Sequence, residues 1–226
     1  MTHKYLSYPL DAVIPVYGGM ESITPEKIKS IRKGDSANTY VFTLQNHWGT
    51  HVDAPNHFFE HGKRIIDYEA DFWIFQKPQI ISLVLRPSEL LTCDDWLDEI
   101  SKETDLLLLS AGWSSQRDSA VYHSHNPGIH PDVAFHLRGN FPRLRAVGID
   151  WISVSPYRHR EIGRSVHRAF LDPQGESEPI LIFEDMDLSG DLTNLLQVAA
   201  FPLRMVQLDS APCTVIGIMD DKSNCF

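Results

Sequence analysis

Three histidines and an aspartate fall within the segment "NHWGTHVDAPNHF", which spans residues 46–58. Imidazole nitrogens and carboxylate oxygens are ligands that zinc, manganese and iron take in proteins. A hydrophobic core could not pack this segment unless every one of these polar atoms found a partner. The segment therefore indicates a catalytic metal site, because three protein ligands leave a coordination position open for water.

The spacing of these residues favours an extended or bent backbone over a helix. His47, Gly49, His51 and Asp53 share one parity, so a strand would project the three polar side chains from the same face. Gly49 has no side chain and would leave room for an ion between the flanking ligands. A helix would align the two histidines but would turn Asp53 away, and Pro55 would end it. We therefore predict His47, His51 and Asp53 as metal ligands.

His57 follows Asp53 by four residues, beyond Pro55, and is close enough in sequence to reach the same cavity. An unperturbed imidazole pKa of about 6.5 suits a group that carries protons at neutral pH. His57 is accordingly the catalytic candidate. A role as a further metal ligand stays open.

Composition bounds the rest of the protein. The chain has 226 residues, 42% of them hydrophobic and 22% charged, which predicts one globular domain over residues 1–226. Its net charge of -10 argues against a nucleic-acid partner, which would require a basic surface. Three scattered cysteines, Cys93, Cys213 and Cys225, predict a reducing, cytoplasmic location. No apolar run approaches the roughly 20 residues that span a bilayer, so no membrane partner is expected.

The elements that must position the site are a mixture of strands and helices. Continuous apolar runs predict strands buried on both faces, at residues 40–44, 79–85, 105–109, 146–152, 180–183 and 213–219. Two segments predict helices, residues 92–103 and residues 130–140, the second opened by Pro131 and stopped near Gly139. The charged run "RHREIGR" is most simply a solvated segment.

The stretch "HWGTHVDAPNH" matches the His-x-Gly-Thr-His-x-Asp-x-Pro-x-His signature of the metal-dependent cyclase or kynurenine formamidase family, which includes isatin hydrolase-like enzymes. The resemblance implies an α/β fold, a single-domain mixed β-sheet core with flanking helices of the swivelling β/β/α type. It also implies a homo-oligomer, since members of this family commonly associate.

Other segments extend the likeness over nearly the whole chain. "IPVYGG" resembles the family's turn at the substrate pocket and places Tyr17 there as a substrate-binding residue. "SVHRAFL" and "ILIFEDMDL" resemble segments that carry metal ligands, which implies His167 and Glu184. The chain departs from the formamidases where it continues with Asp185 instead of asparagine, and this change affects the contacts around the ligand.

The resemblance and the residues together predict a metal-dependent hydrolase that acts on non-peptide C–N bonds. Its substrate would be a small amide-like or cyclic carbonyl compound, such as an aryl formamide, a cyclic amide or a lactone. The cofactor would be zinc or manganese, one or two ions, which activates water while His57 moves the proton. Two alternatives stay open: a non-catalytic protein that binds metal or a small molecule, and a metal-dependent cyclase or dehydratase.

Overall fold

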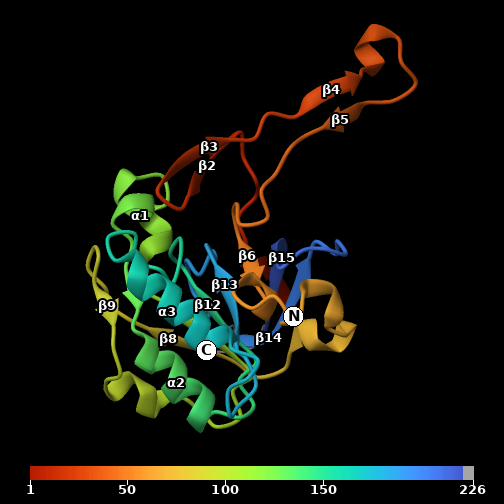
Figure 1. Cartoon of the computed structure of the whole chain (residues 1–226). Helices are drawn as coiled ribbons and strands as arrows, with labels where there is room; N and C mark the ends of the chain where they lie inside the picture. The colour runs from red at the N-terminus through yellow and green to blue at the C-terminus, as the bar shows by residue number, and fades with distance from the viewer. Residues whose placement is uncertain (221–226) are drawn as a thin grey trace, which may run out of the picture.

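The computed structural model describes residues 1–220, so Cys225 lies outside the described part. Its centre is a mixed sheet with the strand order β7-β14-β15-β6-β13-β12-β10-β8, to which β1 adds beside β15 (Figure 1). The strands are β1 (Thr2–Tyr5), β6 (His51–Asp53), β7 (Ile74–Phe75), β8 (Pro78–Ser82), β10 (Leu106–Ser110), β12 (Ala146–Ile149), β13 (Leu181–Glu184), β14 (Leu195–Pro202) and β15 (Ser210–Met219).

Strand direction changes at β6. Strands β8, β10, β12 and β13 run parallel to one another, whereas β6 lies antiparallel between β13 and β15. The register pairs His51 with Glu184, and it pairs Asp53 with both Ile182 and Ser210. Segments far apart in the sequence therefore meet at the carboxyl end of β13, the kind of sheet edge where α/β proteins place their ligands.

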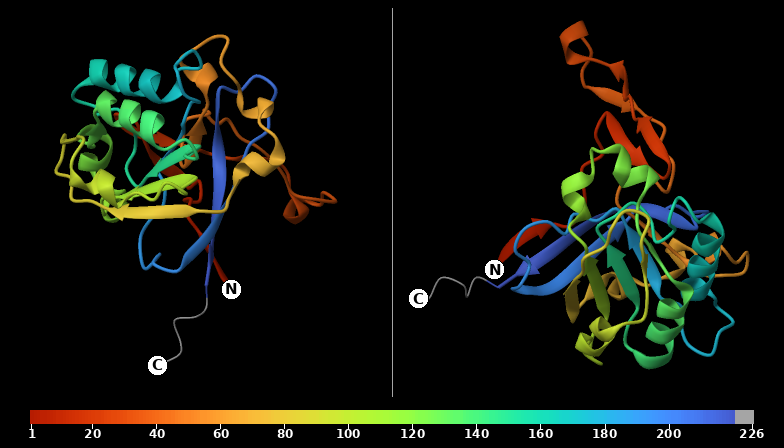
Figure 2. Two further views of the ribbon diagram at one scale, coloured as in Figure 1. Left: turned by 90° about the horizontal axis from the view of Figure 1, so that it is seen from below. Right: turned by 90° about the vertical axis from the view of Figure 1, so that its left-hand side faces the viewer.

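The hydrophobic core lies on both faces of the sheet, as the continuous apolar runs predict. In β10, Leu107 and Leu109 pack into one buried cluster, while Leu106 and Leu108 pack into another on the opposite face. Helices α2 (Pro131–Asn140) and α3 (Arg160–Leu171) pack against each other and bury apolar residues in the first cluster, on one side of the sheet (Figure 2). No helix among residues 1–220 is long and apolar enough to cross a membrane.

Three small two-stranded sheets and a short helix surround this core. They pair β2 (Val13–Val16) with β3 (Gly19–Ser22), β4 (Glu26–Lys29) with β5 (Thr39–Val41), and β9 (Leu90–Leu91) with β11 (Gly128–Ile129), and the helix is α1 (Ala120–Ser124). The β4–β5 hairpin projects from the body as an arm (Figure 1). Every residue of its two strands is exposed.

Most of the predicted elements are present, with shifted ends. Strands β8, β10, β12, β13 and β15 and helix α2 overlap the predicted segments. The predicted buried strand at residues 40–44 is wrong, because β5 lies on the exposed arm. Residues 92–103 form only a short 3-10 helix, Asp95–Glu99. The run "RHREIGR" is mostly exposed, as predicted, but it also opens α3, whose later residues Val166, His167 and Phe170 are buried.

Candidate metal centre

Four buried side chains converge where β6, β13 and α3 meet. His51 and Asp53 lie at the two ends of β6, Glu184 ends β13, and His167 lies on α3. His51 Nε2 lies 3.7 Å from Asp53 Oδ1 and 3.5 Å from Glu184 Oε2. His167 Nε2 lies 3.5 Å from Asp53 Oδ2 and 3.5 Å from Glu184 Oε1. The two imidazoles thus face the same pair of carboxylates.

The backbone fixes the orientation of both imidazoles. His51 Nδ1 lies 2.8 Å from the Gly49 carbonyl oxygen, and His167 Nδ1 lies 2.8 Å from the Gly163 carbonyl oxygen. A carbonyl oxygen only accepts, so each Nδ1 carries a hydrogen and donates it. In the neutral ring, Nε2 is then an unprotonated nitrogen aimed at the carboxylates, which is the state and the direction that a metal-binding histidine requires.

Glu184 is held in place by the loop that follows β12. Its Oε1 accepts hydrogen bonds from Ser153 Oγ at 2.9 Å and from the Val154 backbone N–H at 2.8 Å. Its Oε2 is not bonded to Ser153 or to Val154 and faces His51 instead. One oxygen of this carboxylate is therefore anchored while the other points into the cluster.

Asp53 is the least satisfied polar group of the cluster. It is 1% exposed, and within residues 1–220 neither of its carboxylate oxygens has a hydrogen-bond partner, although both face imidazole nitrogens at 3.2 to 3.7 Å. Burying a carboxylate without hydrogen bonds is costly. A divalent cation would satisfy both oxygens, and two neutral imidazoles with two carboxylates suit such an ion. The residues present therefore fit a divalent metal.

His47 and His57 form a second group of potential ligands with Asp53. His47 Nδ1 lies 3.2 Å from Asp53 Oδ1, and the His47 and His57 ring centroids are 4.3 Å apart. Potential ligand atoms of His47, Asp53 and His57 lie within 4.8 Å of one another, as do those of His51, Asp53 and Glu184. Asp53 belongs to both groups, so its carboxylate is shared by two candidate sets of metal ligands.

The charges of the cluster shift the pKa values of its members in opposite directions. Burial alone would lower the pKa of His51, but contact with Glu184 and the charge of Asp53 outweigh it and raise that pKa to about 9. Burial would also lower the pKa of His167, but its contacts with Asp53 and Glu184 outweigh burial and raise that pKa to about 10. Burial opposes the effect in Glu184 as well, yet the two histidines lower its pKa to about 2. In the metal-free protein, protons thus occupy the positions that suit a cation.

The structure corrects the predicted role of Gly49. His47 lies in a turn and only His51–Asp53 is extended, so of the two predicted geometries the segment takes the bent one at residue 47. Gly49 has a φ of 70°, and an added Cβ would lie 2.6 Å from Leu10 Cδ2. Glycine is required here by the left-handed turn and the tight packing, rather than by space for an ion. The turn aims the Gly49 carbonyl at His51.

A cavity of about 220 Å³ opens onto the cluster. It is lined by Tyr17, Phe58, Ile152 and Ser155 together with the histidines and carboxylates. The structure therefore brings together every site residue predicted from the sequence: His47, His51, Asp53, His57, His167, Glu184 and Tyr17. Phe58 stacks on His167 with their ring centroids 4.9 Å apart, which makes one face of the cavity apolar.

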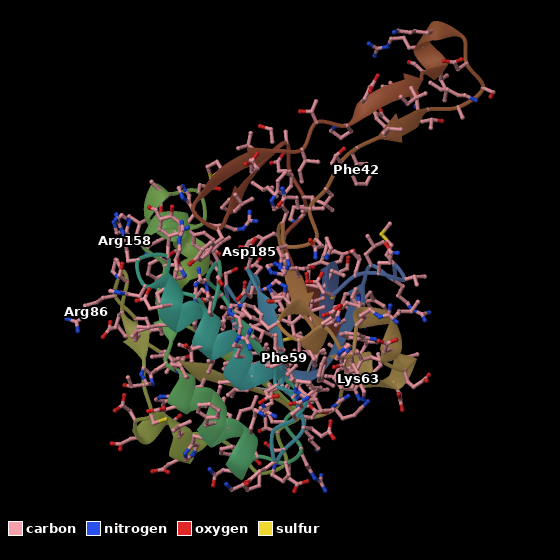
Figure 3. All side chains as sticks on the ribbon, viewed as in Figure 1. Phe42, Phe59, Lys63, Arg86, Arg158 and Asp185 are labelled. Atoms are coloured by element: carbon pink, nitrogen blue, oxygen red, sulfur yellow. The ribbon has the colours of Figure 1, made fainter. Side chains whose placement is uncertain are left out.

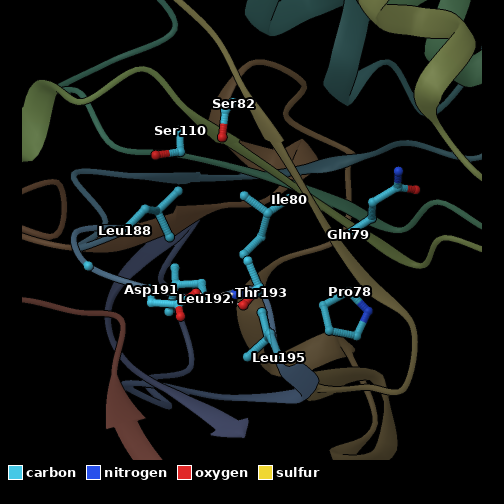
Figure 4. Close-up of a pocket in the computed structure, with 11 residues that line it drawn as sticks. Pro78, Gln79, Ile80, Ser82, Ser110, Leu188, Asp191, Leu192, Thr193 and Leu195 are labelled. Atoms are coloured by element: carbon cyan, nitrogen blue, oxygen red, sulfur yellow. Dashed lines mark hydrogen bonds between the residues drawn. The ribbon is translucent and has the colours of Figure 1, made fainter. Parts of the chain in front are cut away.

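A second cavity, about 420 Å³, lies between β8 and the loop before β14 (Figure 4). It is larger than the first, but its lining includes no histidine and a single carboxylate, Asp191, which already accepts hydrogen bonds from Thr193. Size alone does not make a reactive site, and the chemistry favours the smaller cavity.

Two residues of the site were not predicted from the sequence. Asp209 precedes β15, and its Oδ2 accepts a 2.7 Å hydrogen bond from His57 Nδ1. Burial would raise the pKa of Asp209, but the hydrogen bond from His57 outweighs it and the pKa is lowered. Ser153 holds Glu184, as described above. The segments around both residues carry no signal beyond ordinary polar composition, and only the pairing of β15 with β6 places Asp209 here.

Together, the mixed sheet and the buried imidazole and carboxylate cluster define an α/β protein with the donor set of a divalent-metal centre. The family model described as putative cyclase matches residues 5–156. The chain belongs to this family.

Curated relatives and solved structures agree with this assignment. The chain is similar to kynurenine formamidase from Geobacillus thermodenitrificans, 27% identical over 209 residues and covering 92% of each chain. The Bacillus anthracis kynurenine formamidase is 24% identical over 218 residues, covering 93% of this chain and 94% of its own.

Among solved structures, isatin hydrolase A from Labrenzia aggregata, bound to benzyl benzoate, superposes with a TM-score of 0.76 at 17% identity and covers 96% of this chain and 93% of that chain. A potential metal-dependent hydrolase with cyclase activity gives a TM-score of 0.66 at 20% identity, with 96% of each chain covered. At these identities the structural likeness concerns the fold, and it confirms the α/β architecture expected from the sequence.

Proposed function

We propose that the protein is a metal-dependent hydrolase of a small amide-like or cyclic carbonyl substrate, such as an aryl formamide, a cyclic amide or a lactone. The observation that carries this proposal is Asp53, a buried carboxylate that has no hydrogen bond from the described part of the chain, is faced by imidazoles and lines a cavity. The names of the similar kynurenine formamidases support hydrolysis of a C–N bond outside peptides.

We propose His47, His51, Asp53, His167 and Glu184 as the residues that would hold the metal. When bound, a divalent metal supplies Lewis acidity, which polarises a substrate carbonyl and makes water acidic enough to attack at neutral pH. The buried groups His51, Asp53, His167 and Glu184 suit zinc or manganese, and the two groups that share Asp53 support a count of two ions over one.

His57 is proposed as the group that moves the proton. Its Nδ1–H is committed to Asp209, so its Nε2 is the nitrogen left to take a proton from the attacking water and to return it to the departing amine. A histidine oriented by a carboxylate is the arrangement by which many enzymes hold a general base. Tyr17 and Phe58 would pack against the planar part of the substrate, since both line the cavity.

The His57–Asp209 pair favours an enzyme over a protein that only binds metal or a small molecule, because simple binding has no need of an oriented proton carrier. A panel of aryl formamides, isatin-like cyclic amides and lactones tests this choice, assayed with and without added zinc or manganese. Turnover of at least one member only in the presence of metal is the expected result. A metal-loaded protein that turns over none of them contradicts the hydrolase.

Labelling with heavy-oxygen water distinguishes a hydrolase from the cyclase or dehydratase alternative. A hydrolase incorporates one oxygen atom of heavy-oxygen water into its product, whereas a cyclisation or dehydration incorporates none. We expect a single labelled oxygen in the product.

We further propose that the protein forms a homo-oligomer through the arm. The arm exposes the apolar side chains of Ile28, Ile31, Tyr40, Val41 and Phe42, each of them at least 50% exposed. Figure 3 shows Phe42 at the base of the arm, away from the packed body. A second copy would cover this surface. Light scattering on the intact chain should give a dimer or larger assembly, and Phe42→Ser together with Val41→Ser should weaken it.

A cytoplasmic location remains a proposal based on cysteine usage. Cys93 and Cys213 are both free thiols, and Cys213 is buried. Free thiols suit a reducing compartment. Fractionation of the native host's cells would test this location.

A further inference from the structure

A buried ion pair lies directly behind the candidate metal centre. Asp185 follows Glu184 in the chain, is 0% exposed and accepts two hydrogen bonds from Arg117, from Nε at 2.9 Å and from Nη2 at 2.7 Å. The Tyr122 hydroxyl donates a third bond to Asp185 Oδ1 at 2.5 Å. Asp185 lies in the interior, below the β2–β3 hairpin (Figure 3).

The backbone of Asp185 adopts a conformation that few residues tolerate. Its φ is 53°, in the left-handed region, where aspartate is among the non-glycine residues that occur. Such a conformation is costly and persists only where the surroundings hold it. The turn directs the Asp185 carboxylate toward Arg117 and Tyr122, while the Glu184 carboxylate faces the two histidines.

The same residue reaches the other strand that carries proposed ligands. The Thr50 hydroxyl donates a hydrogen bond to the Asp185 carbonyl oxygen and accepts one from the Tyr8 backbone N–H at 3.0 Å. Thr50 immediately precedes His51, and His51 pairs with Glu184 in the sheet register. Asp185 therefore follows the proposed ligand Glu184 in the chain, and it is hydrogen-bonded to Thr50, the residue before the proposed ligand His51.

Arg117 is itself held in a fixed place. Its guanidinium carbon lies 4.0 Å from the centre of the Tyr8 ring, and its side chain is 12% exposed. Tyr8 also bonds Thr50 through its backbone, so the contacts form a closed loop from Arg117 through Asp185, Thr50 and Tyr8 back to Arg117. A closed set of buried polar contacts restricts the motion of every member.

We propose that Asp185 is a positioning residue for the metal centre, with Arg117 and Tyr122 as its supports. The ion pair fixes the turn after Glu184 and, through Thr50, the start of β6, so it sets the relative position of Glu184 and His51. This inference rests on the proposed metal site.

The test compares metal affinity with stability in matched variants. Asp185→Asn and Arg117→Met each break the pair near the centre, and Tyr122→Phe removes one bond without changing charge. Arg145→Met is the control. Arg145 also pairs with a carboxylate, Asp105, at 3.1 Å and bonds the Phe72 carbonyl, but it precedes β12, at the end of the sheet opposite to Glu184.

Each variant is stripped of metal, melted thermally, and titrated with zinc against a chromophoric chelator. We expect Asp185→Asn and Arg117→Met to raise the zinc Kd by about 10- to 100-fold, the usual effect of losing a contact behind a ligand. Arg145→Met should lower the melting temperature yet leave the zinc Kd within about threefold of wild type. Tyr122→Phe should weaken zinc binding severalfold while remaining folded.

Unchanged zinc binding in folded Asp185→Asn would overturn the inference, as would an equal loss of affinity in Arg145→Met. If both charge variants fail to fold, unchanged zinc binding in Tyr122→Phe overturns it. A wild-type protein that does not bind zinc or manganese would contradict the proposed function itself, which is a distinct result.

Discussion

Asp209 Oδ2 accepts a 2.7 Å hydrogen bond from His57 Nδ1, across 152 residues of sequence. The same carboxylate accepts a second bond, from Asn46 Nδ2 to Oδ1 at 2.8 Å. Asp209 therefore links Asn46, at the start of the histidine-rich segment, to His57, near the end of that segment. The proposed proton carrier is held by a group that lies outside that segment.

Replacing Asp209 should therefore slow the reaction without emptying the metal site. Asp209→Asn keeps the size of the side chain but removes the charge that orients His57. Because general acid–base catalysis contributes about 10² to 10⁴ in rate, we expect kcat to fall by about 10- to 100-fold. Steady-state kinetics together with elemental analysis measure both effects. A loss of bound metal in this variant would instead make Asp209 part of the metal site.

His57 itself has two open roles, and one variant separates them. His57→Ala should retain its metal and lose about 10²- to 10⁴-fold in kcat, because the proton carrier is gone. The measurement is metal content per chain beside turnover. If the variant purifies with one ion fewer than wild type, His57 is a ligand, as its place in the group with His47 and Asp53 would allow.

The metal-free protein should become less stable as the pH rises above neutrality. The pKa values of His51 and His167, about 9 and about 10 when folded, exceed the unfolded value of about 6.5. Protonation of these groups therefore stabilises the fold fully below pH 6.5, and this stabilisation is lost as the pH rises through 9 to 10. Thermal melting in the presence of a chelator should show a falling midpoint between pH 7 and pH 10.

Bound metal should remove most of that decline, because the ion takes the place of the two protons. The matched experiment repeats the pH series with saturating zinc. Parallel curves with and without zinc would indicate that His51 and His167 do not hold the ion.

Gly49 should resist substitution for two separate reasons. Gly49→Ala places a Cβ against Leu10 in a left-handed turn, at a cost of about 1 to 3 kcal/mol, and shifts the carbonyl that orients His51. Gly139→Ala is the control, since Gly139 lies within α2 and an added Cβ would meet nothing within 4 Å. The control should stabilise the protein by about 0.5 to 1 kcal/mol. Urea unfolding measures both, and a neutral Gly49→Ala would refute the role of the turn.

The sequence predicted which residues gather at the site better than the backbone geometry that gathers them. Side-chain types were enough to indicate His51 and Asp53, because few other roles explain such a cluster. The sequence left extended and bent geometry both open for residues 47–53, since alternation alone does not reveal the left-handed turn at Gly49. Only the family likeness indicated His167 and Glu184, as contacts between β6, β13 and α3 depend on tertiary pairing.

Helix α3 shows why other parts of the fold could not be predicted. Its first turn is charged and exposed, as the sequence predicts, but the sequence did not indicate that the same helix continues and buries Val166, His167 and Phe170. The buried strand predicted at residues 40–44 is wrong because most of these residues are apolar but exposed. Its apolar side chains belong to the exposed arm, where we propose that a second copy covers them.

The central claim is that Asp53, which belongs to two groups of potential ligands, holds a divalent metal. The most direct measurement is calorimetric titration of chelator-stripped protein with zinc, in wild type and in Asp53→Asn. Saturable binding at one or two ions per chain is predicted for the wild type, with the folded variant losing that binding almost entirely. Equal zinc binding by folded Asp53→Asn, or no binding by the wild type, would contradict the claim.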